Sequence, residues 1–119
     1  YTLNVTRRDM VQCGYAPSVR LFEAAACGTP IISDPWDGLD EFFRPGPEIL
    51  ISHSASETLK VLREMPETER LRIGQAARAR VLQRHTASHR AEELERHFEE
   101  VSLSTESAAV APTRNEMRI

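Results

Sequence analysis

The sequence has 119 residues, which is enough for one small domain with a single hydrophobic core. Hydrophobic residues make up 40% of the chain and charged residues 28%, which is ordinary for a globular protein. The net charge of −3 gives no electrostatic reason to expect nucleic acid or an anionic membrane as a partner.

The first part of the chain predicts a strand followed by a helix. Residues 1–6 alternate apolar and polar side chains, which is typical of a short strand, and residues 9–14 suit a loop or a short helical turn. Pro17 suits the first position of a helix, because a missing N–H costs nothing there. Gly28 suits the position just after the end of that helix, near Cys27.

Two further strands should follow this helix. Residues 29–33 form a short apolar run between turn signals, as in a buried strand of a parallel sheet. We expect a loop over residues 34–38 and one or two helical turns over residues 39–43. Residues 48–52 predict the third strand.

Helices should make up most of the remaining chain. Residues 54–65 begin with the capping-box pattern Ser-x-x-Glu, which predicts the start of a helix, and a second helix should cover residues 66–84. A last helix is expected over residues 88–101, and a disordered tail over residues 102–119, where periodicity fades. The candidate core residues of the second helix are Leu71, Ala77, Val81 and Leu82.

Strands that alternate with helices predict an α/β fold with a parallel sheet. Three strands are few for a doubly wound domain, so we expect a partial Rossmann-like sheet whose missing strands precede Tyr1. The chain opens on a strand without an initiator Met and is expected to be a piece of a longer protein. The predicted domain covers residues 1–101.

The cysteine count and the hydropathy indicate the compartment. Two cysteines are too few for a disulfide framework, and Cys27 lies in an alanine-rich run, where a buried free thiol is expected. No apolar run approaches the roughly 18 residues of a membrane span. No leader resembling a signal peptide is legible. These features favour a cytoplasmic protein.

Polar residues follow the predicted strands, at the edge of the sheet where ligands bind in open α/β folds. Arg7 follows the first strand, and Asp34 and Trp36 follow the second. The ring of Trp36 offers a stacking face. Polar residues are common at strand ends, so this arrangement permits a site without specifying one.

The start of the helix at Pro17 is a candidate anion site, since a helix N-terminus offers unpaired N–H groups and positive dipole. Gly14 allows the backbone to come close to a diphosphate, and Ser18 adds a hydroxyl. From spacing alone, an ordinary helix start is favoured over this site.

Glu23 lies inside the predicted helix and can accept hydrogen bonds from the two hydroxyls of a ribose. The alternative is an exposed glutamate or one paired with Arg20, one turn earlier. Arg20 could instead neutralise phosphate charge.

No metal site is expected from the spacing of potential ligands. His85 and His89 are four residues apart, but no Glu or Cys with metal-ligand spacing accompanies them. Asp34, Asp37 and Asp40 lack the rest of a calcium-binding loop. The sequence shows no recognisable pattern of a nucleophile with an adjacent base, and no catalytic residue is assigned.

The segment Gly14-Tyr15-Ala16-Pro17-Ser18-Val19-Arg20-Leu21-Phe22-Glu23-Ala24-Ala25-Ala26-Cys27-Gly28-Thr29-Pro30 resembles the nucleotide-sugar signature of GT-B glycosyltransferases of group 1. Within that group it is similar to the branch related to the spore maturation protein CgeB. The resemblance extends over about residues 3–98. It implies the C-terminal Rossmann-like half of a two-domain enzyme, which binds the nucleoside diphosphate sugar, while the other half mostly binds the acceptor.

The resemblance also implies roles for individual residues. Glu23 matches the glutamate that holds the donor ribose, and the helix start at Pro17, Ser18 and Val19 matches the backbone that cradles the diphosphate. Gly14 together with Pro17 and Ser18 fits the CgeB-like pattern. Neither a metal nor a cofactor is usually needed in this fold.

One position departs from the family pattern. Many related enzymes have another glutamate eight residues before the ribose-binding one, and this chain has Tyr15 there. A tyrosine cannot act as that carboxylate. We regard Tyr15, together with Arg7 and Asp34, as candidates for contacts with the donor.

The expected function is transfer of a hexose from a nucleoside diphosphate sugar to an acceptor in the full-length protein. The expected partners are the donor and an N-terminal acceptor domain of the same protein, and the 119 residues alone should be inactive. The alternative is a non-enzymatic α/β binding or interaction module that has kept only the fold. A receiver-like domain would need an acidic cluster after the first strand, which residues 4–6 lack.

Overall fold

The computed structural model describes residues 1–15 and 17–109 of the chain. Within it the chain divides into two compact units, with the boundary between Thr86 and Ala87. The first unit contains the sheet and five helices among the described residues, and the second contains one long helix. The two units are therefore described separately.

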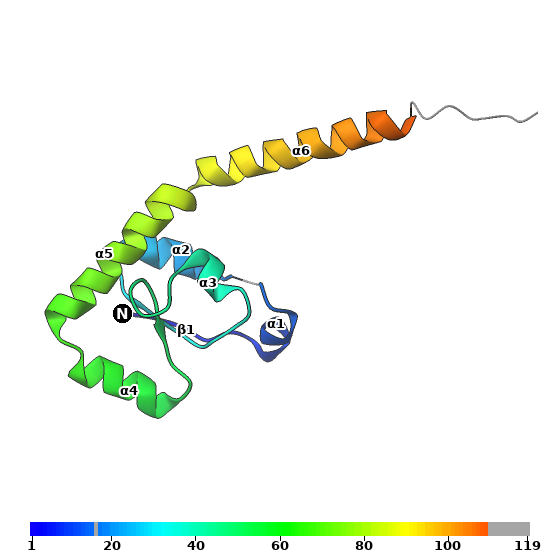
Figure 1. Ribbon diagram of the computed structural model, residues 1–119. Coiled ribbons are helices and arrows are strands. Elements are labelled where there is room, and N and C mark those ends of the chain that lie inside the picture. Colours follow the sequence, from blue (N-terminus) through cyan, green and yellow to red (C-terminus); the bar gives the residue numbers. More distant parts are fainter. Residues whose placement is uncertain (16, 110–119) are drawn as a thin grey trace, which may run out of the picture. The chain divides into compact units, whose positions relative to one another are not determined.

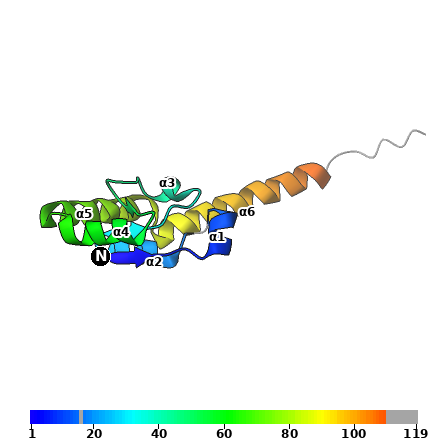
Figure 2. The ribbon, with the colours of Figure 1, turned by 90° about the horizontal axis from the view of Figure 1, so that it is seen from below.

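The first unit is built on a three-stranded parallel sheet, which confirms the predicted α/β class. Its strands are β1 (Thr2–Asn4), β2 (Ile31–Ser33) and β3 (Leu50–Ile51), in the order β1-β2-β3. Each strand is shorter than its predicted segment: β1 and β3 lie inside theirs, and β2 occupies the last three residues of its segment. In both views β1 runs from the N-terminus toward α1 (Arg8–Cys13), so the carboxyl ends of the strands face that side of the unit (Figures 1 and 2).

Helix α2 (Val19–Ala26) connects the first two strands and begins later than predicted. Ser18 is its N-cap, with the side chain accepting a hydrogen bond from the Arg20 N–H at 3.3 Å. Pro17 therefore lies one residue outside the cap, and its expected place in the first turn was wrong. The helix begins after Ser18 because the serine hydroxyl can accept a hydrogen bond from a backbone N–H of the first turn. Gly28, with φ of 70°, follows the C-cap as predicted.

Helices α3 (Leu39–Phe42), α4 (Ala55–Glu64) and α5 (Glu67–Arg84) follow β2 and β3. The predicted capping box is present at the start of α4. The Ser54 hydroxyl accepts from the Glu57 N–H at 3.2 Å, and the Glu57 carboxylate accepts from the His53 N–H at 2.7 Å. Both views place α1 on the opposite side of the unit from the turn between α4 and α5 (Figures 1 and 2).

The main core lies between the sheet and the helices α2, α3 and α5. Its buried residues include Leu21 and Ala25 of α2, and also Ala77 and Val81 of α5, which the sequence predicted. The described buried residues of this core cluster are Leu21, Ala25, Ile31, Trp36, Leu39, Phe43, Ile49, Ala77 and Val81.

Four expectations about burial were wrong. Leu71 and Leu82 are about half exposed, because they project from α5 away from the face that carries Ala77 and Val81. Cys27 is exposed, since it is the C-cap of α2 rather than part of its buried face. Trp36 is only 8% exposed and packs in the core, so its ring faces are not offered for stacking.

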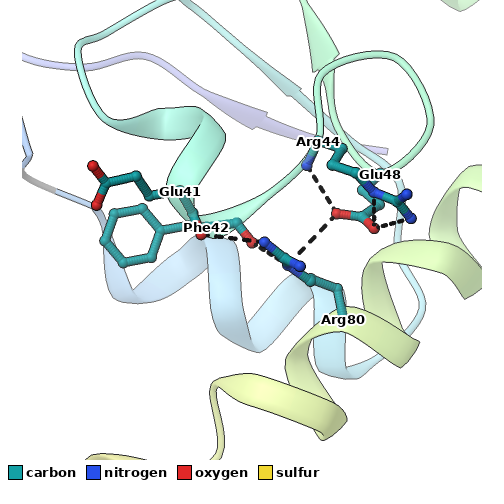
Figure 3. Close-up of polar contacts among 5 residues, drawn as sticks. All are labelled: Glu41, Phe42, Arg44, Glu48 and Arg80. Atoms are coloured by element: carbon teal, nitrogen blue, oxygen red, sulfur yellow. Dashed lines mark hydrogen bonds and ion pairs between the residues drawn. The ribbon is translucent and has the colours of Figure 1, made fainter.

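The loop between α3 and β3 is fastened to α5 by a buried carboxylate (Figure 3). Glu48 is 3% exposed and accepts from the backbone N–H and the Nε of Arg44, both at 2.8 Å. Arg80 of α5 lies 3.8 Å from the same carboxylate and donates to the Phe42 carbonyl at 3.0 Å. Burial raises the pKa of Glu48, but the Arg44 hydrogen bonds and the two guanidinium charges outweigh it and lower the pKa below its ordinary value.

Helix α5 also comes very close to the turn after α2. Gly74 is buried, and a Cβ atom added there would lie 2.1 Å from the Gly28 carbonyl oxygen and 3.1 Å from Pro30 Cδ. One turn further along α5, the Arg78 side chain donates to the Ala26 carbonyl at 3.1 Å. The turn after α2 is thus held by close packing and by an arginine cap.

The second unit is the helix α6 (Ala87–Ala109). It begins one residue before the predicted start and continues past residue 101, so the first part of the expected tail is helical. Residues 110–119 of that tail lie outside the described residues. Among the described helices, none is both long enough and apolar enough to cross a membrane.

Candidate functional site

The carboxyl ends of β1 and β2 are tied together by polar side chains. The Asn4 amide donates to the Ser33 hydroxyl at 3.0 Å, and both side chains are buried. The Asp34 carboxylate accepts from the Thr6 N–H at 3.0 and 3.1 Å and from the Thr6 hydroxyl at 2.9 Å. Asp34 therefore fixes the loop that leads from β1 to Arg7.

This loop forms one wall of a hollow between the end of β1, helix α1 and the start of α2. The hollow has a volume of about 290 Å³. It brings together Arg7 and Arg20, which are both exposed, with the half-buried Ser18. Its described lining is Asn4, Val5, Thr6, Arg7, Met10, Ser18 and Arg20.

The hollow has the chemistry of an anion site. Two guanidinium groups carry positive charge, and the N-terminal end of α2 adds the positive end of a helix dipole. The Arg20 guanidinium donates to the Leu3 carbonyl at 3.5 Å, which is a long bond that leaves most of its donors for other acceptors. Sequence reasoning proposed Arg7, Ser18 and Arg20 separately, and the structure places them around one space.

Glu23 lies one turn beyond Arg20 on α2 and is exposed. Arg20, Glu23 and Cys27 recur at helical spacing and are all exposed, so they share the outer face of the helix. No described contact pairs Glu23 with Arg20, whose guanidinium instead reaches toward β1. Glu23 is outside the described lining of the hollow. It lies on the same exposed face of α2 as Arg20, which does line the hollow.

Gly14 and Tyr15 pack against the loop after β2. Gly14, with φ of 64°, is the C-cap of α1, and a Cβ there would lie 3.1 Å from the Cβ of Asp37. Tyr15 has φ of 51°, and its N–H donates to the Asp37 carbonyl at 2.7 Å. Its ring packs against Gly38 and remains 62% exposed. In the structure these residues join two loops, and they lie outside the described lining of the hollow.

The remaining residues of the predicted cradle flank the hollow. Pro17 is half-buried and precedes the N-cap, whereas Val19 is 69% exposed in the first turn of α2. Met10, which does line the hollow, was missed because residues 9–14 did not predict a definite helix. Helix α1 gave only a weak signal because it has just six residues.

A second, larger hollow of about 510 Å³ adjoins the first through Asn4 and Val5. It lies between the carboxyl ends of the strands and the first turns of α4, and much of its lining is apolar. The described residues that line it are Leu3, Asn4, Val5, Ser33, Asp34, Ser52, His53, Ser54, Ala55, Thr58 and Leu59.

The histidines singled out in the sequence do not gather ligands for a metal. The His85 ring lies among Phe22, Phe42 and Phe43, with ring centroids 5.6, 5.8 and 6.3 Å away. In the part of the chain that the structure describes, no three His, Cys, Asp or Glu side chains are grouped as a metal site would require.

Comparison with known proteins gives one match. Residues 1–96 match the model of a family described as glycosyl transferase-like. No curated protein and no solved structure matches the chain. The matched range contains the whole sheet, both hollows and the exposed face of α2.

Proposed function

The chain belongs to the glycosyl transferase-like family, and from that premise we propose that residues 1–101 bind the nucleoside diphosphate sugar of a glycosyltransferase. The domain would be the C-terminal Rossmann-like half of a GT-B enzyme in the CgeB-like branch. It would transfer a hexose to an acceptor bound mainly by an N-terminal domain of the same protein. We place this reaction in the cytoplasm, which the free thiols of Cys13 and Cys27 support.

The observation that carries the proposal is the hollow at the start of α2. Arg7 from the loop after β1 and Ser18 and Arg20 from the start of α2 converge there, next to the end of β1. A diphosphate needs concentrated positive charge and N–H or O–H donors, and this space supplies both. In the proposed reaction the sugar leaves a nucleoside diphosphate, so the same groups stabilise the negative charge that develops on the leaving group.

Glu23 supplies the second contact in this proposal. It is five residues after Ser18, so the helix rise separates the two by about 7.5 Å along the axis of α2. In a nucleoside diphosphate, the distance between the ribose hydroxyls and the phosphates is comparable to this separation. An ionised carboxylate at Glu23 would accept from those hydroxyls while the phosphates occupy the hollow.

Tyr15 and Asp34 have more limited roles in the proposed donor binding. Asp34 holds the Thr6 loop through three hydrogen bonds and so positions Arg7, rather than using its carboxylate on the donor. Tyr15 presents an exposed ring near the start of α2 and would contact the donor by packing, because it cannot replace a carboxylate. The acceptor contacts would come from the other half, so we expect these 119 residues to be inactive alone.

The test is a titration of the folded 119-residue chain with UDP, GDP and their sugars, followed by the amide shifts of the backbone. We expect at least one nucleotide to shift residues 14–23. Arg20→Ala should weaken its binding about tenfold or more, because a charged hydrogen-bond partner is lost. Arg63→Ala, which removes an exposed arginine from α4, is the matched control and should bind as the parent does.

Two results separate the proposal from its alternative, a binding module that has kept only the fold. If no nucleotide shifts residues 14–23 in a folded sample, donor binding by this domain is wrong. In the full-length protein, Glu23→Ala should reduce transferase activity strongly. Unchanged activity would favour the alternative, a binding module that has kept only the fold.

A further inference from the structure

Tyr15 has a backbone conformation that costs free energy. Its φ of 51° is left-handed, and in the part of the chain that the structure describes no other residue except glycine has such a φ. Bulky side chains rarely adopt this conformation. It persists only where the surroundings hold it, and it occurs preferentially at ligand-binding and catalytic sites. The conformation of Tyr15 therefore calls for an explanation in its contacts or in its function.

Two contacts with the loop after β2 hold Tyr15 in place. Its N–H donates to the Asp37 carbonyl at 2.7 Å. Its ring packs on Gly38, where an added Cβ atom would lie 2.4 Å and 2.6 Å from two neighbouring ring carbons. Because these two distances are so similar and so short, Gly38 lies against the flat face of the ring and not beside its edge. A residue larger than glycine leaves no room for the ring in this position.

The ring gains little burial from these contacts. Tyr15 is 62% exposed although Gly38 covers one face of the ring, so the opposite face is open to solvent. An aromatic side chain stabilises a fold mainly through the large area that it buries, and Tyr15 buries little. A ring that is held rigidly with one free face is instead suited to contact the apolar surface of a ligand.

The order of groups along the chain indicates which part of the donor meets this ring. Tyr15 precedes the N-cap Ser18 by three residues, which span at most about 11 Å. Glu23, the proposed ribose contact, lies on the other side of Ser18, inside α2. A diphosphate in the hollow carries the nucleoside at one end and the sugar at the other. With the nucleoside directed toward Glu23, the sugar is directed toward Tyr15.

We propose that the free ring face of Tyr15 binds the sugar ring of the donor, an inference that rests on the proposed donor binding. The C–H groups on one side of a pyranose ring form an apolar surface, which packs on the face of an aromatic ring. Tyr15 thereby makes the domain prefer a sugar nucleotide to the free nucleoside diphosphate. Gly38 is a positioning residue, because it sets where the ring lies and does not itself contact the sugar.

Isothermal titration calorimetry of the folded 119-residue chain compares UDP with UDP-glucose and GDP with GDP-mannose. The readout is the ratio of the two dissociation constants within a pair, and we expect the parent to prefer the sugar nucleotide in at least one pair. Tyr15→Ala should abolish this preference by weakening the sugar nucleotide about tenfold, while the free nucleotide binds as before. Tyr15→Phe keeps the ring and should keep the preference. Arg20→Ala should weaken both members of the pair to the same extent, because both carry the diphosphate.

Gly38→Ala tests the position of the ring without altering Tyr15. The new Cβ would occupy space that the ring needs, so the preference for the sugar nucleotide should fall as it does in Tyr15→Ala. Gly46→Ala is the matched control. Gly46 has a φ of 90°, almost the same as the 91° of Gly38, but no described atom beyond its chain neighbours would lie within 4 Å of its added Cβ. It introduces the same backbone strain and should leave the preference unchanged.

The outcomes separate this inference from the proposed function. If the parent binds neither the nucleotides nor the sugar nucleotides, the proposed function is wrong and the inference is wrong with it. If the parent binds both members of each pair equally, or if Tyr15→Ala weakens both to the same extent, donor binding stands and the contact between Tyr15 and the sugar is refuted. Loss of the preference in Tyr15→Phe, or equal effects of Gly38→Ala and Gly46→Ala, would also overturn binding by a positioned ring face.

Discussion

Gly74→Ala sets two physical effects against each other within α5. Replacing a glycine by alanine inside a helix ordinarily stabilises it by about 1 kcal/mol. At this position the new Cβ would lie 2.1 Å from the Gly28 carbonyl oxygen, more than 1 Å inside an ordinary 3.4 Å contact. The obstacle is backbone, so the helix or the turn must move.

The packing effect should win. Overpacking a well-packed contact costs typically 1–3 kcal/mol, and a backbone obstacle places this site near the upper end. After the helix gain, we expect a net loss of about 2 kcal/mol. That corresponds to a fall in Tm of about 10 °C for a domain of this size.

The assay is urea denaturation of the 119-residue chain followed by circular dichroism. Ala79→Gly is the matched control, because Ala79 is exposed on the same helix and the variant should lose only about 1 kcal/mol through helix propensity. If Gly74→Ala proves as stable as the parent or more stable, the close contact between α5 and the Gly28 turn is not a constraint and the reasoning fails.

Two further changes test polar contacts described above. Glu48→Gln should cost about 2–3 kcal/mol in urea denaturation, because the two arginines lose a charged acceptor. Since the pKa of Glu48 is lowered in the folded state, this contribution is full above the unfolded pKa and is lost as pH falls through the folded pKa. The deficit of the variant should therefore shrink in acid, and a deficit independent of pH would contradict the assignment. Ser54→Ala should cost about 1 kcal/mol through loss of the α4 cap. Ser56→Ala, two residues later and exposed, should cost little, and equal losses would argue against the capping box.

Local signals predicted the order of the elements. The apolar run of residues 29–33, the Ser-x-x-Glu box at Ser54 and the glycine at position 28 each act through a few neighbouring residues, and all three have the predicted structure. Boundaries were less certain. Proline and serine both favour a helix start at residues 17 and 18, and only the hydroxyl-to-N–H bond of Ser18 decides between them.

Contacts between distant residues were beyond the reach of the sequence. Nothing near Glu48 indicates that Arg80, 32 residues later, approaches its carboxylate, or that Gly74 meets Gly28. The candidate site likewise combines residues that local signals indicated with contacts between distant residues that they did not. Arg20 and Ser18 were suggested by helix chemistry, but their meeting with Arg7 and Met10 depends on the path of the loop that Asp34 holds.

The contacts of α5 determine how this protein can be cut into pieces for study. Arg78 and Arg80 donate to the carbonyls at the ends of α2 and α3, and Gly74 sits against the turn that enters β2. An expression boundary drawn after β3 would keep every described strand and still remove these three supports. A shortened protein that preserves the sheet should therefore end after residue 86, and the helix that looks like an appendage to the strands is part of the smallest piece worth producing.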